Sequence, residues 1–97
     1  MPSPTRKNKE VWLLTSRVGE EEKPVCVCGT FKAVYAIALF QMRIAEASRT
    51  ERAAREDWKK AGHVWIWDRS RFQSFEEAMW SPLGSLALIE KIPVKNI

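Results

Sequence analysis

The sequence of 97 residues has few of the residues on which enzyme and metal sites commonly depend. It holds two cysteines, one histidine and four glycines. A structural zinc site takes about four ligands, and a disulfide scaffold takes more than two cysteines, so both are excluded. The sequence contains no glycine-rich phosphate loop, nucleophile elbow or dinucleotide fingerprint. These absences predict a protein that is not an enzyme and that binds no metal or cofactor.

Long apolar runs are also missing. The longest, residues 33–40, has eight residues, whereas a membrane span takes about twenty. The first nine residues lack the apolar stretch of a secretory signal. We therefore expect a cytoplasmic protein with no membrane partner. The apolar content of 45% is typical of a folded domain, and a chain of this length carries one core.

The formal net charge is +4, and half of this excess lies at the N-terminus. Three cations there, Arg6, Lys7 and Lys9, stand against Glu10 alone. We expect residues 1–9 to form a flexible basic tail and residues 10–97 to form a single domain. Because the domain itself carries little excess charge, nucleic-acid binding is permitted by composition but is not required by it.

Hydrophobic alternation and β-branched residues predict three strands, at residues 11–16, 25–28 and 63–68. Propensity is ambiguous over residues 86–94, where position along the chain favours a fourth strand. Pro93 places the last strand at a sheet edge, since proline lacks a ladder donor. A capping box at Ser74 opens a short helix that Pro82 stops. The predicted fold class is α+β: an antiparallel sheet with the order ββαβαβ along the chain and one long helix on a face.

The long helix is predicted over residues 31–61, which contain no glycine or proline. Apolar residues recur there at steps of three and four from Ala33 to Trp58. Such a helix would be about 45 Å long, whereas the predicted strands reach only about 20 Å. The alternative is a break at Ser48, where a capping box could start a second helix that folds back onto the short helix.

If the helix is continuous, its second half projects beyond the sheet and carries a narrow apolar seam flanked by charges. Such a seam is typical of a helix that packs against another chain. The expected partner is a second copy in a homodimer or a foreign protein or protein complex. The predicted partner-binding residues are Ala47, Arg49, Arg52, Ala54, Arg55 and Trp58.

A second candidate surface follows from the tryptophans of the third strand. If Val64 and Ile66 face the helix, Trp65 and Trp67 face outward, where indoles can stack on bases. The predicted nucleic-acid-binding residues are Trp65, Trp67, Arg69 and Arg71, together with Arg6, Lys7 and Lys9 of the tail. The alternative is that these tryptophans belong to a sheet face packed under the long helix.

Cys26 and Cys28 lie two residues apart on one face of the second strand. The simplest interpretation is two small buried hydrophobic side chains. A catalytic thiol with His63 as its base would require the second and third strands to be neighbours.

The first half of the chain also carries a resemblance. Residues 10–16 read Glu-Val-Trp-Leu-Leu-Thr-Ser, and a second strand and Gly29-Thr30-Phe31 then lead into an alanine-rich helix. This order resembles small strand-strand-helix accessory proteins of bacteriophages. The resemblance implies a protein that binds and blocks a host enzyme or defence complex, and it assigns no catalytic residue.

Overall fold

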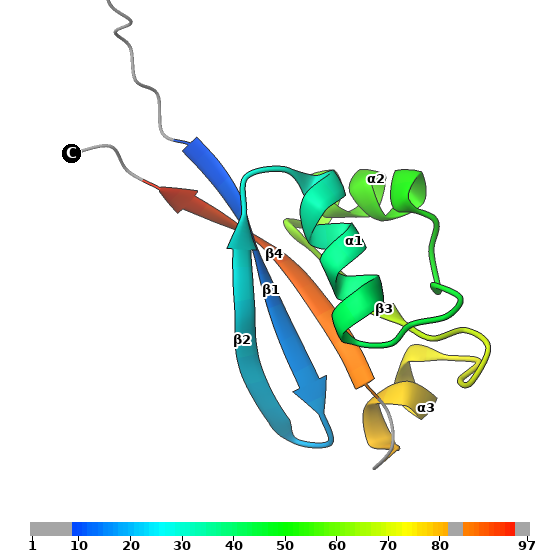
Figure 1. Cartoon of the computed structure of the whole chain (residues 1–97). Helices are drawn as coiled ribbons and strands as arrows, with labels where there is room; N and C mark the ends of the chain where they lie inside the picture. The colour runs from blue at the N-terminus through cyan, green and yellow to red at the C-terminus, as the bar shows by residue number, and fades with distance from the viewer. Residues whose placement is uncertain (1–8, 82–84, 95–97) are drawn as a thin grey trace, which may run out of the picture.

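The computed structural model describes residues 9–81 and 85–94, and it has the predicted α+β fold, with a four-stranded antiparallel sheet and three helices (Figure 1). The strands and helices within these ranges are β1 (Lys9–Val18), β2 (Glu21–Cys28), α1 (Phe31–Gln41), α2 (Glu51–Ala61), β3 (His63–Trp67), α3 (Phe75–Trp80) and β4 (Ser85–Val94). Lys9, which was predicted to end the basic tail, pairs with Val94 in the sheet. Arg6, Lys7 and Pro82 lie outside the described residues.

The strand order in the sheet is β2-β1-β4-β3. The prediction that the last strand lies at an edge is therefore wrong, because β4 lies between β1 and β3. Proline is tolerated there because β3 pairs with β4 only as far as Glu90. Pro93 lies beyond that point, where β1 is the only strand of the described residues that pairs with β4.

The prediction of one continuous helix over residues 31–61 is also wrong. α1 ends at Gln41, and the next residue but one, Arg43, has a left-handed backbone with φ 53°. The chain then crosses residues 42–50 without helix before α2 begins at Glu51. The Thr50 side chain, not that of Ser48, caps α2 by accepting a hydrogen bond from the Ala53 amide (3.3 Å). The apolar spacing keeps its phase across this break, so that periodicity alone could not reveal it.

Hydrogen bonds with residues distant in the sequence fix the conformation of the segment between α1 and α2. Asp68, which is buried, accepts a hydrogen bond from the amide of Ala45 (3.3 Å), and Ala47 forms an isolated antiparallel bridge with Asp68. The Ser48 amide donates to the carbonyl of Trp67 (2.9 Å). These bonds satisfy backbone groups that leave the helical ladder, which explains why no glycine or proline is needed there.

The sheet carries apolar clusters on both faces. α1 and α2 cover one face, where Trp58 (8% exposed) and Ala54 (0%) belong to the main core with Val64 and Ile66. α3 covers part of the opposite face, where Phe72, Ala78 and Leu86 form a second cluster. The alternative of a break is confirmed, because Ser48 lies between the two helices. Its second part is wrong, since α2 packs beside α1 and not on α3, which lies at the far end of the sheet in Figure 1.

Candidate functional site

The outer edge of β3 has unpaired backbone groups. The Lys91 amide donates to the carbonyl of Gly62 (3.0 Å), which fixes the phase of the ladder between β3 and β4. Because hydrogen-bonded and non-bonded pairs alternate in antiparallel sheets, His63, Trp65 and Trp67 direct their N–H and C=O groups away from β4. No hydrogen bond within residues 9–81 and 85–94 uses these outward groups of His63 or Trp65.

The segment before α2 pairs with only the last residue of this edge. Ser48 donates its amide to the Trp67 carbonyl (2.9 Å), and its hydroxyl oxygen accepts from the Trp67 amide (3.3 Å). The chain then turns away, because Thr50 caps α2. Residues 47–48 therefore start a fifth strand beside β3 that the chain itself does not continue.

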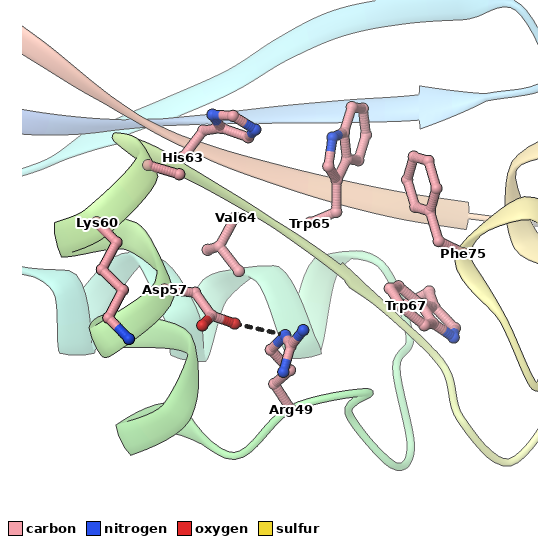
Figure 2. A pocket seen from close by; sticks show the side chains of 9 residues that line it. Arg49, Asp57, Lys60, His63, Val64, Trp65, Trp67 and Phe75 are labelled. Atoms are coloured by element: carbon pink, nitrogen blue, oxygen red, sulfur yellow. Dashed lines mark ion pairs between the residues drawn. The ribbon is translucent and has the colours of Figure 1, made fainter.

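A cavity of about 380 Å³ lies along the unpaired part of the edge. Figure 2 shows that His63 and Trp65 project from one side of the β3 ribbon, and Val64 projects from the other side, toward α2. The cavity is therefore open to both faces of the strand. Its lining residues are Arg49, Asp57, Lys60, Ala61, His63, Val64, Trp65, Trp67 and Phe75.

The side of the cavity formed by α2 and the residue Arg49 before it is cationic. Arg49 and Asp57 form an ion pair there, with 2.6 Å between Nε and the carboxylate oxygen (Figure 2). This pair neutralises both charges. No ion pair within the described parts of the chain uses Lys60, which is exposed at the end of α2. The helix side therefore has an excess of one positive charge.

The other side of the cavity is aromatic. Phe75, the first residue of α3, lies 5.2 Å from Trp65 and 5.9 Å from Trp67 between ring centroids, and both pairs are tilted. All three side chains are only half-buried. Tilted rings at such distances attract one another and keep the indoles in fixed positions. Rigid aromatic side chains of this kind bind apolar groups with little loss of conformational entropy.

The opposite edge of the sheet, β2, is built differently. β2 has a bulge between its partners Leu14 and Thr15, where Val25 is the extra residue. Pro24 lacks an amide donor, and charged side chains fill the rest of this half of the strand. Bulges, proline and charge are the features that protect sheet edges from further pairing. Of the two edges, that of β3 is therefore the better acceptor for another strand.

The predicted helical seam does not form a docking surface. Ala54 and Trp58 are buried in the main core, where Trp12 and Phe31 contact the Trp58 ring at centroid distances of 5.2 and 6.1 Å. Ala47 is half-buried and bridges to Asp68. The seam is covered because α2 is a separate helix that lies on the sheet.

The three arginines beside the seam have separate environments. Arg55 pairs with Glu51 (3.5 Å) and lies over the Phe31 ring (5.5 Å), as expected for the spacing of four residues on a helix. Arg52 is exposed on α2. Of the six predicted partner-binding residues, Arg49 alone lines the cavity beside β3.

The nucleic-acid surface is assembled only in part. Trp65 and Trp67 line the cavity, on the face away from Val64 and Ile66 as expected. Arg69 instead pairs with Glu46, and Arg71 lies over the Phe72 ring (5.7 Å). Neither of these arginines lines the cavity.

The cysteines and the histidine are far apart. Cys26 and Cys28 are half-buried, with 3.9 Å between their sulfur atoms. They lie on β2 and His63 lies on β3, so the two strands are at opposite edges of the sheet. At about 4.8 Å per strand the separation is about 14 Å, so the thiols and the imidazole are too far apart for the catalytic pair that neighbouring strands would have allowed. Burial, followed by the hydrogen bond with Cys28, raises the pKa of the Cys26 thiol.

Sequence reasoning missed Asp57, Lys60 and Phe75 as members of a common site. α2 brings the first two, and α3 brings the third, to the two sides of β3. The only local signal was the outward alternation of the third strand, which identified the tryptophans. The positions of Asp57 and Lys60 depend on the break between α1 and α2, and that of Phe75 depends on the packing of α3 beside β3.

Comparison of the chain with protein-family models, with curated proteins and with solved structures finds no match. None of the helices within residues 9–81 and 85–94 combines the length and the apolar character needed to cross a membrane. The same residues contain no group of three or more side chains placed to hold a metal ion.

Proposed function

We propose that this chain is a non-enzymatic protein-binding protein that takes an extended segment of its partner onto the outer edge of β3. One observation carries the proposal: the outward backbone groups of His63 and Trp65 are unpaired, and both residues line a cavity with side chains from both faces of the strand. Strand addition to such an edge gains affinity from main-chain hydrogen bonds and specificity from the flanking side chains.

The resemblance to small accessory proteins of bacteriophages supplies the class of partner, a host enzyme or defence complex that would be blocked by binding. A homodimer was expected from the helical seam. Since Ala54 and Trp58 are buried, the surface from which a homodimer was inferred is not exposed to a second copy.

A pair of variants at one position tests the proposal. Trp65→Pro removes the outward amide donor, whereas Trp65→Val removes the same indole and keeps the donor. Proline is tolerated at this position because the Trp65 amide does not bond to β4 and Val64 before it is extended. Comparing the two variants therefore isolates the contribution of one main-chain hydrogen bond.

Peptides that bind the wild-type chain would be selected from a random display library, synthesised, and titrated against both variants by fluorescence anisotropy. We expect binding to Trp65→Pro to be about 3- to 10-fold weaker than binding to Trp65→Val, the ratio expected for the loss of one hydrogen bond. Circular dichroism checks that both variants fold.

Equal affinity for the two folded variants would contradict the proposal. A titration with single-stranded oligonucleotides at two salt concentrations tests the other class of partner. Micromolar binding that falls steeply with salt, without any peptide binding, would replace the proposal with nucleic-acid binding.

A further inference from the structure

The two sides of the β3 edge differ in chemistry, and this difference specifies the segment that the edge accepts. We propose that the bound segment is antiparallel to β3 and alternates apolar and acidic residues, with an apolar residue opposite Trp65 and an acidic residue opposite Val64. This inference rests on the proposed function, because it names the partner chemistry of the same site.

The direction follows from the start of the fifth strand. The bridge between Ala47 and Asp68 is antiparallel, and the Ser48 hydrogen bonds with Trp67 continue it. A segment that follows this row along β3 keeps the same direction. Three residues, opposite His63, Val64 and Trp65, fill about 10 Å of edge.

The preference for an apolar residue opposite Trp65 follows from the pleat of the sheet. In an antiparallel pair, residues opposite each other point to the same face of the sheet. A side chain opposite Trp65 therefore lies on the face of Trp65, Trp67 and Phe75, whose half-buried rings form the aromatic side of the cavity. Burial against these rings favours a leucine-sized or aromatic residue.

The preference for an acidic residue opposite Val64 follows from the charged side chains on the face covered by α2. A side chain opposite Val64 points toward α2, as Val64 itself does in Figure 2. The charged groups there are Arg49, Asp57 and Lys60, of which the first two neutralise each other at 2.6 Å. The remaining ammonium group of Lys60 attracts a carboxylate and repels a cation.

The test uses peptides of eight residues that alternate leucine with either glutamate or lysine, titrated by NMR up to 1 mM against the ¹⁵N-labelled chain. We expect the glutamate peptide to bind at least about fivefold more tightly than the lysine peptide. Lys60→Glu should reverse this order. Lys23→Glu, the same charge change on β2 at the opposite edge of the sheet, should leave both affinities within about twofold.

N-methylated peptides distinguish a failure of the proposed alternation of residues from a failure of strand addition itself. In the proposed register the leucine amides face β3 and the glutamate amides face away, so methylation of the leucine amides should abolish binding and methylation of the glutamate amides should not. If the glutamate and lysine peptides bind alike and Lys60→Glu changes neither, the alternation is wrong, while sensitivity to leucine methylation would keep strand addition. If leucine methylation has no effect, or if the His63 and Trp65 amides do not shift at 1 mM peptide, both proposals fail.

Discussion

Trp58 exemplifies how one residue decides between two accounts of the chain. In an exposed seam it would anchor a partner, but here it packs between Trp12 and Phe31 and is only 8% exposed. Lys91 also lies over its ring, at 5.9 Å. Trp58 thus joins α2 to the sheet and to α1.

The first prediction concerns this residue. We expect Trp58→Ala to lower the free energy of unfolding by about 3–5 kcal/mol, because it removes a large buried ring and leaves a cavity. Arg52→Ala, an exposed change on the same helix, should cost less than about 0.5 kcal/mol. Urea unfolding measures both. A Trp58→Ala protein as stable as the wild type would show that the ring is not part of the core.

Asp68 is a second residue with an effect beyond its own position, because it supports the segment that crosses between α1 and α2. Burial raises the pKa of its carboxyl group, but the hydrogen bonds donated by Ser70, Ala45 and Glu46 outweigh burial, so that this pKa lies below its ordinary value. Because the folded-state pKa is lowered, ionised Asp68 stabilises the fold above about pH 4, where an aspartate of the unfolded chain titrates. This stabilisation is lost as the pH falls through the folded-state pKa.

We therefore expect Asp68→Asn to lower the free energy of unfolding at pH 7 by about 1–3 kcal/mol, since it replaces an ionised acceptor of several hydrogen bonds. The difference from the wild type should shrink as the pH is lowered below about 4. Urea titrations between pH 7 and pH 2 measure this change, with Glu20→Gln as the control for an exposed carboxylate. A difference that stays constant across this range would contradict the assignment.

The cysteines give a third prediction at the residue scale. Because burial raises the pKa of Cys26, its thiolate is scarce at neutral pH. We expect Cys26 in the folded chain to react with iodoacetamide more slowly than glutathione does at pH 7. Mass spectrometry of timed samples reports the rate for each cysteine. A Cys26 that reacts faster than glutathione would reopen the possibility of thiol chemistry.

At the scale of elements, the break between α1 and α2 decides where the site forms. Without it Ser48 could not reach Trp67, and neither Arg49 nor Lys60 could lie beside β3. Arg43 offers a direct test of the break, because its φ of 53° disfavours every residue but glycine, asparagine and aspartate.

Arg43→Gly should raise the free energy of unfolding by up to about 1 kcal/mol, because glycine adopts a positive φ without steric cost. In a continuous helix the same change would lower it by about 1 kcal/mol. The sign of the change in thermal or urea unfolding therefore distinguishes the two arrangements. Arg52→Gly, inside α2, is the matched control and should be destabilising.

The sequence predicted those elements whose signals are local. The first three strands and the capped start of α3 at Ser74 are present, and so is the fourth strand, which position favoured. The break after α1 was not predicted, because residues 42–50 contain no glycine or proline and are held by Asp68 and Trp67, more than fifteen residues away in the chain. The candidate site was predicted only as far as the outward direction of the tryptophans.

At the scale of the whole molecule, the sheet has two edges and two faces with different roles. The helix-covered face supplies most of the core, and the β2 edge is protected by its bulge, proline and charges. The opposite face keeps exposed aliphatic side chains, of which Val27 is 57% exposed. Among these surfaces, the β3 edge combines unused hydrogen-bonding groups with side chains that can select a partner.

Hydrogen exchange of the β3 amides, followed by NMR, tests the central claim most directly. In the free chain we predict fast exchange at His63 and Trp65 and slow exchange at Val64 and Ile66, because only the latter pair donates to β4. Binding of the alternating leucine and glutamate peptide should slow the exchange of His63 and Trp65. Slow exchange at these two amides in the free chain, or no slowing when the peptide is bound, would contradict the account.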